Sequence, residues 1–144
     1  MKTNNKRWVL GHEITQHPIS EDYDLVSIAT PPGVPGPPPH RHLSYKEAFI
    51  IIEGEMEFMI DGETKVLRAG ESIAIPPNTL HTFNNLSNQV CRWVNIHSPK
   101  GFTDFFDEVG IPAGEETAQE RSVEPAVIQQ VIAIAADHDM RIEM

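Results

Sequence analysis

Short apolar segments separated by turn residues occupy the chain between residues 48 and 98. Each segment is only a few residues long and ends at glycine, proline or asparagine, which favours strands over helices. Asp61 and Gly62 separate two of these segments, and an Asp-Gly pair in that position is a strong signal for a β-hairpin. Together with candidate strands at residues 7–11 and 23–30, the pattern predicts roughly eight short strands and an all-β sandwich or barrel.

The last third of the chain changes to a helical pattern. Apolar residues from Phe102 to Val109 repeat at i, i+3, i+4 and i+7, and Gly110 and Pro112 then stop the helix. A polar linker is expected at residues 115–122, and a second helix at residues 124–140 with Pro125 in its first turn. We therefore expect a β-barrel over residues 1–100, including the N-terminal strands, and a helical extension over residues 101–144 packed on the same domain.

The composition narrows the choice of partners and compartment. The chain has 144 residues, enough for one domain with a core. Its net charge of −10 argues against binding to nucleic acid or to an anionic membrane surface. The single cysteine, Cys91, cannot form an internal disulfide and is expected to be a small buried hydrophobe. There is no signal-peptide pattern and no membrane-spanning run, so a cytoplasmic location is expected by default.

Two histidines follow a proline-rich segment that is expected to form a stiff loop over residues 31–39. On an extended chain His40 and His42 point to the same face, and Glu47 can reach the same place if the chain bends after His42. His81 comes from a distant strand that could face them across a closed sheet. A single histidine is more often a core residue, and Glu47 beside Lys46 could be a surface charge, so the prediction depends on the combination.

Three neutral imidazoles and one carboxylate suit a divalent first-row transition metal, such as iron, manganese, nickel, copper or zinc. Four protein ligands leave coordination positions open when the ion prefers six ligands. A closed structural zinc site is usually rich in cysteine, whereas this set of residues contains none.

The spacing of these residues resembles the first motif of the cupin family. That motif is a glycine, five residues, His-x-His, three or four residues, a glutamate, six residues and a glycine. His40, His42, Glu47 and Gly54 stand at matching positions, whereas Val34 replaces the leading glycine.

The second cupin motif is matched further along the chain. Gly70, Pro76, His81 and Asn85 stand at the family's spacing, and Asn78 replaces the glycine of the motif's Pro-x-Gly. Asparagine tolerates a left-handed turn better than most residues, so the turn can persist. The resemblance implies a jelly-roll barrel, or double-stranded β-helix, with one or two C-terminal helices and a metal held by His40, His42, Glu47 and His81.

The C-terminal part resembles small bacterial single-domain cupins of the quercetin-2,3-dioxygenase-like type. That resemblance implies a metal-dependent dioxygenase acting on a small aromatic or enolic molecule, with Glu47 also acting as the catalytic base for the substrate's hydroxyl proton. Apolar residues on alternating faces of the strands are expected to supply a dry pocket, and the candidates are Phe49, Ile51, Met56, Phe58, Ile73, Ile75, Phe83 and Trp93.

Two other functions are left open by the sequence: a module that binds or senses a small ligand without turnover, and a sugar-type isomerase or epimerase. A small-molecule substrate and a homodimer paired through exposed strand edges are expected. His97 lies on a predicted strand and could line the barrel, whereas His12, His17 and His138 have no partners at ligand spacing.

Overall fold

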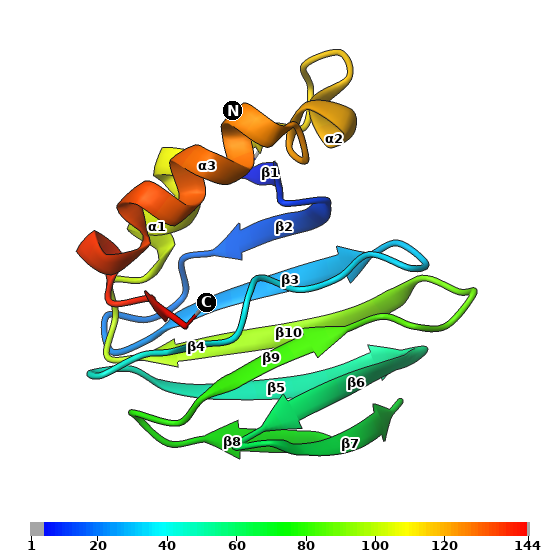
Figure 1. Cartoon of the computed structure of the whole chain (residues 1–144), viewed down its shortest axis with the longest axis vertical. Coiled ribbons are helices and arrows are strands. Elements are labelled where there is room, and N and C mark those ends of the chain that lie inside the picture. Colours follow the sequence, from blue (N-terminus) through cyan, green and yellow to red (C-terminus); the bar gives the residue numbers. More distant parts are fainter. Residues whose placement is uncertain (1–4, 144) are drawn as a thin grey trace.

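Two antiparallel sheets face each other in the computed structural model, which describes residues 5–143 (Figure 1). The larger sheet has the order β11-β1-β2-β3-β10-β5-β8. Its strands are β1 (Lys6–Val9), β2 (His12–His17), β3 (Asp24–Thr30), β5 (Lys46–Glu53), β8 (Ser72–Ile75), β10 (Cys91–Ser98) and β11 (Ile111–Pro112). The smaller sheet has the order β12-β4-β9-β6-β7. Its strands are β4 (His40–Arg41), β6 (Glu55–Ile60), β7 (Glu63–Arg68), β9 (His81–Asn84) and β12 (Arg141–Ile142).

The turn residues act as the sequence predicts. Asp61 and Gly62 both have positive φ angles, of 48° and 86°, and join β6 to β7 in a two-residue hairpin with Ile60 opposite Glu63. Asn78 also has a positive φ, of 62°, so the asparagine does replace the motif glycine in a left-handed turn. The all-β fold with C-terminal helices is confirmed.

Aromatic side chains fill the space between the sheets. Phe49 packs against Phe58, Phe83 and Trp93, with ring centroids 4.8–5.8 Å apart. Alternation along each strand brings these rings inward, because residues i and i+2 share a face. Most of the residues expected to line a pocket are instead part of this packed core, namely Phe49, Ile51, Met56, Phe58 and Ile75.

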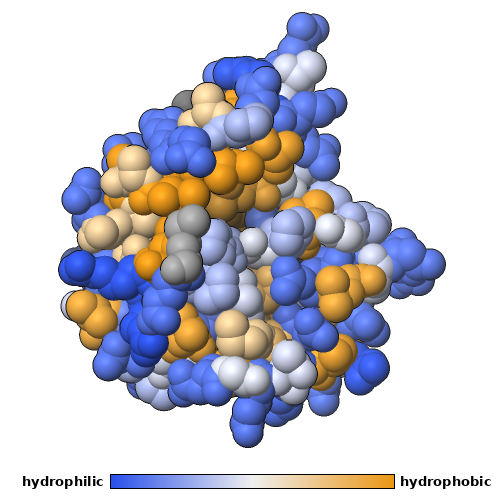
Figure 2. Space-filling model, in the orientation of Figure 1, coloured by the Kyte–Doolittle hydropathy of each residue, from blue (hydrophilic) through white to orange (hydrophobic). Residues whose placement is uncertain are grey.

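The C-terminal part forms α1 (Thr103–Val109), α2 (Ala118–Arg121) and α3 (Pro125–Ile134), and α3 continues into a short 3-10 helix, η1 (Ala135–His138). The expected linker over residues 115–122 therefore contains the short helix α2. The helices lie beside β1 and β2 in Figure 1. In the same view apolar side chains gather in a band between α3 and the neighbouring strands (Figure 2). After η1 the chain returns to the smaller sheet as β12.

The edges of both sheets are short strands or hairpins. β1 is paired on both sides, with β2 and with β11, so it is not itself an edge. The homodimer stays a prediction. Among the helices of residues 5–143, none combines the length and the apolar character needed to cross a membrane.

Candidate metal centre

The four predicted metal ligands come together at one end of the space between the sheets. β4 carries His40, the turn after it carries His42, and Glu47 and His81 come from β5 and β9. The pairing of β4 with β9 sets His40 directly opposite His81. Each of the four offers one ligand atom within 4.8 Å of the others, and all four side chains are buried. This group of residues could hold a metal ion.

A backbone carbonyl fixes the orientation of each of the three histidine rings. The Nδ1 atom of His40 donates to the Pro38 carbonyl at 2.9 Å, and that of His81 donates to the Thr79 carbonyl at 2.8 Å. The Nδ1 atom of His42 donates to the Asp139 carbonyl at 2.8 Å. Because a carbonyl can only accept, Nδ1 carries the proton in all three rings and Nε2 is the ligand atom.

Glu47 lies where these Nε2 atoms converge. Its Oε1 atom is 2.9 Å from Nε2 of His81 and 3.3 Å from Nε2 of His42. Burial acts to raise the pKa of this carboxyl group, but the nearby His97 ring and the hydrogen bonds from His42 and His81 hold the pKa well below its usual value. The carboxylate is therefore ionised, which is the form that binds a cation.

The histidine rings respond differently to the same surroundings. Burial lowers the pKa of His40 to about 3, and the charges of His81 and His42 act in the same direction. Burial also acts to lower the pKa of His42, but the hydrogen bond and charge of Glu47 outweigh burial and raise it. His40 is thus neutral at ordinary pH and could bind a metal without losing a proton, whereas a metal would compete with a proton at His42 below the raised pKa of that ring.

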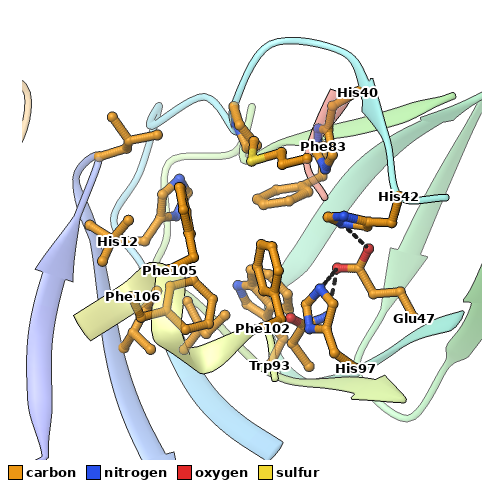
Figure 3. A pocket seen from close by; sticks show the side chains of 17 residues that line it. His12, His40, His42, Glu47, Phe83, Trp93, His97, Phe102, Phe105 and Phe106 are labelled. Atoms are coloured by element: carbon orange, nitrogen blue, oxygen red, sulfur yellow. Dashed lines mark hydrogen bonds and ion pairs between the residues drawn. The ribbon is translucent and has the colours of Figure 1, made fainter. Parts of the chain in front are cut away.

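The second carboxylate oxygen of Glu47 faces two residues of β10. Asn95 Nδ2 donates to Oε2 at 3.0 Å, which holds the carboxylate plane in place. His97 Nε2 is 3.3 Å from the same oxygen but is not aligned to hydrogen-bond with it, and among the described residues it has no hydrogen-bond partner. His42 and His97 flank the carboxylate in Figure 3. Burial lowers the pKa of His97 to about 4, although the charge of Glu47 acts in the opposite direction.

A cavity of about 70 Å³ is lined by three of the four candidate ligands, His40, His42 and Glu47. His97 lines it, as its strand position suggested, and the His97 ring stacks on Phe102 with centroids 4.2 Å apart. Five aromatic rings line it together with aliphatic side chains, and the rings are those of Phe83, Trp93, Phe102, Phe105 and Phe106 (Figure 3). Within residues 5–143, no lysine or arginine is part of the lining.

His12 also lines this cavity but takes part in a separate chain of hydrogen bonds. Trp93 Nε1 donates to Thr30 Oγ1 at 2.9 Å, and the Thr30 hydroxyl bonds Nδ1 of His12 at 2.9 Å. Nε2 of His12 then donates to the Pro35 carbonyl at 3.0 Å. Burial lowers the pKa of His12 to about 4. No spacing rule identified His12, because its two partners, Thr30 and Pro35, lie 18 and 23 residues away in the chain.

Asn95 and Asp139 were also missed at the sequence level. Asn95 could have been found, since it stands two residues before His97 on a predicted strand and so shares its face. Asp139 could not, because its partner His42 lies 97 residues away in the chain.

Comparison with known proteins agrees with this geometry. Residues 27–97 match the family model described as the cupin domain. The matched segment runs from β3 to β10 and contains all four candidate ligands. These residues therefore form a cupin domain, with further strands before it and helices after it.

Two curated relatives match part of this chain. Quercetin 2,3-dioxygenase of Bacillus subtilis is 32% identical over 73 residues, which are 51% of this chain and 21% of that protein. The HTH-type transcriptional regulator PuuR of Escherichia coli is 37% identical over 57 residues, which are 40% of this chain and 31% of that protein. The chain thus spans less than a third of either relative.

A solved structure of an RmlC-like cupin from Shewanella frigidimarina superimposes with a TM-score of 0.60. The two chains are 23% identical, and the match covers 67% of this chain and 85% of the other. At this identity the likeness supports the fold alone.

Proposed function

We propose that the protein binds one divalent first-row transition metal through His40, His42, Glu47 and His81. The observation that carries the proposal is the shared orientation of the three rings: a backbone carbonyl occupies each Nδ1 atom, and each Nε2 atom faces the carboxylate of Glu47. Nitrogen and oxygen donors of this kind suit iron, manganese, nickel, copper or zinc. The identity of the metal is a matter for elemental analysis.

We further propose that the metal serves a dioxygenase reaction on a small aromatic or enolic molecule. When bound, the metal would supply Lewis-acid chemistry and a template for the substrate's oxygen atoms. Glu47 is ionised and can accept the hydroxyl proton of the substrate. Asn95 keeps the carboxylate oriented, and the aromatic wall excludes water from the reacting groups.

The cavity favours a small substrate. Its volume of about 70 Å³ is far below the roughly 300–1,000 Å³ of sites for drug-sized ligands. A molecule as large as a flavonol would need the aromatic wall to move, whereas a small diketone or a catechol needs less room. The similarity to the Bacillus subtilis dioxygenase supports oxygenase chemistry for this cupin domain, and the cavity favours a smaller molecule than quercetin.

A second candidate is a module that senses a small ligand without turnover. The similarity of part of this chain to the regulator PuuR supports it. A sugar phosphate is disfavoured by the absence of lysine and arginine from the cavity lining within residues 5–143, since a phosphate group needs a cationic partner.

The test is oxygen uptake by the purified, metal-analysed protein with a panel of diketones, catechols and flavonols. We expect uptake with the small compounds, little with flavonols, and none with any compound in His40→Ala. His17→Ala is the matched control, because His17 lies on β2 outside the candidate centre. Tight binding of a compound without product would favour the sensing module, and uptake that persists in His40→Ala would overturn the proposal.

A further inference from the structure

We propose that Asp139 is a positioning residue of the metal centre, and that the C-terminal segment 139–143 completes the centre from outside the cupin domain. The inference rests on the proposed metal binding. Residues 139–143 lie well beyond the matched segment 27–97, yet they contact the His-x-His segment along its whole length. In Figure 1 the end of the chain lies beside β4.

The main-chain carbonyl of Asp139 sets the orientation of one ligand. It accepts the Nδ1 proton of His42 at 2.8 Å, which leaves Nε2 free to face Glu47. The other two ring orientations depend on carbonyls only two residues before each histidine, those of Pro38 and Thr79. His42 alone among the three depends on a distant part of the chain, so its orientation requires Asp139 to stay in place.

The Asp139 side chain holds the backbone that follows His42. Its Oδ1 atom accepts from the amide of Leu43 at 3.0 Å, and its Oδ2 atom accepts from the amide of Ser44 at 2.7 Å. The carboxylate thus bonds two successive amides while the carbonyl of the same residue bonds the ring. A rotation of the His42 ring would break its bond to the carbonyl, and a shift of the backbone after His42 would break the two bonds to the carboxylate.

The position of Asp139 at the end of η1 favours a role of its carboxylate in holding residues 43 and 44. It follows η1 directly, with a left-handed φ of 58°, and a carboxylate at a helix C-terminus interacts unfavourably with the helix dipole. The carboxylate therefore does not stabilise its own helix, and its bonds are made to residues 43 and 44 instead. Asparagine tolerates the same backbone conformation, so Asp139→Asn removes the charge without straining the turn.

Strand β12 supports the other half of the His-x-His segment. Ile142 pairs with His40 and Arg141 with Arg41, and the amide of Glu143 donates to the Pro39 carbonyl at 2.9 Å. β4 is only two residues long and is bonded to β9 on its other side. Without β12, the strand that carries His40 would be an exposed edge.

The test compares zinc affinity, measured by competition with a chromophoric chelator, in the wild type, Asp139→Asn and Asp137→Asn. Asp137 is an exposed neighbour in η1, so its variant makes the same charge change without touching the centre. We expect Asp139→Asn to bind zinc about 10- to 100-fold more weakly, as for other partners of metal-ligating histidines, and Asp137→Asn to match the wild type.

A second comparison separates positioning from general stabilisation. If Asp139 acts through His42, then Asp139→Asn should weaken zinc binding in the wild type but have little further effect in a His42→Ala background. If Asp139→Asn fails to fold, the His42 Nδ1 proton in the zinc-loaded wild type provides the test by NMR. We expect that proton to be observed and protected from exchange, and its absence would overturn the inference.

The outcomes also distinguish the two proposals. A wild type that binds none of iron, manganese, nickel, copper and zinc contradicts the proposed function, and this inference with it. A wild type that binds zinc, together with a folded Asp139→Asn variant of equal affinity, overturns only the role of Asp139. An equal loss in the presence and absence of the His42 ring would also overturn it.

Discussion

The histidines of this chain differ mainly in what their ring nitrogens contact. His40, His42 and His81 each donate from Nδ1 to a carbonyl and direct Nε2 toward Glu47, whereas both nitrogens of His12 have hydrogen-bond partners of their own. The partners of His12 are a hydroxyl and a backbone carbonyl, whereas Nε2 of each candidate ligand faces a carboxylate that could bind the same metal ion. The same residue type therefore has two roles within one cavity.

His12 should make the stability of the protein depend on pH. Burial lowers its pKa from 6.5 to about 4, so the unfolded chain takes up a proton before the folded chain does as the pH falls. Stability is therefore lost between these two pH values. From pH 7 to pH 5 this single group accounts for a loss of about 2 kcal/mol. Urea unfolding of metal-free protein at both pH values should show a smaller loss, by about that amount, in His12→Gln. An equal loss in the two proteins would contradict the prediction.

Metal affinity should rise with pH because of His42. Its pKa is raised in the metal-free protein by Glu47, so a proton competes with the metal below that pKa. Affinity is then lowest in acid and increases up to about tenfold per pH unit while one proton is displaced, before it levels off above the pKa of His42. Chelator competition at pH 6, 7 and 8 measures this slope. An affinity that is flat, or that falls as the pH rises, would rule out His42 as a ligand that exchanges a proton for the metal.

At the scale of elements, the sequence predicted the strands and helices that are marked by a local pattern of turn or apolar residues. The hairpin of β6 and β7 follows from Asp61 and Gly62, and α1 follows from its spacing of phenylalanines. β2 was missed because its buried positions are His12 and Ile14, so the strand has little apolar alternation. The short helix α2 was missed because most of it is polar and exposed.

The candidate site also contains a part that local sequence patterns predict and a part that they do not. The four ligands could be predicted because both motifs have fixed spacing within the segment from residue 40 to residue 81. The contact of His42 with Asp139, and the hydrogen bonds of His12, join residues that no local pattern connects. Such contacts depend on how the C-terminal helices and the proline-rich loop pack, which local periodicity does not specify.

The proline-rich loop approaches β9 closely at Gly36. Its amide donates to the Phe83 carbonyl at 2.7 Å, and a Cβ atom there would overlap that oxygen and meet the Phe83 ring at 3.0 Å. Gly36→Ala should therefore cost about 1–3 kcal/mol of stability, as other overpacked sites do. Gly114→Ala is the control, because a Cβ at that exposed turn meets nothing within 4 Å and should change stability by less than about 0.5 kcal/mol. Urea unfolding compares the two, and equal stabilities would contradict the close approach.

At the scale of the whole molecule, the centre joins segments that are otherwise far apart. Its four candidate ligands come from β4, the turn after it, β5 and β9, which belong to both sheets. Asp139 and β12 hold the His-x-His segment from outside. A metal bound there would connect the two sheets to each other and, through His42, to the C-terminal segment. Ligand binding to the folded state alone stabilises the entire fold, not only the site.

Metal binding should therefore raise the unfolding temperature of the whole chain in a single transition. At a metal concentration 100 times its dissociation constant, the gain is about 2.7 kcal/mol, or roughly 5–10 °C for a domain of this size. Differential scanning calorimetry of metal-free protein, with and without zinc, measures the shift. His81→Ala should lose most of it, because the ligand set is then incomplete, whereas His17→Ala should keep it. A shift of equal size in His81→Ala would mean that zinc stabilises the protein from somewhere other than this centre.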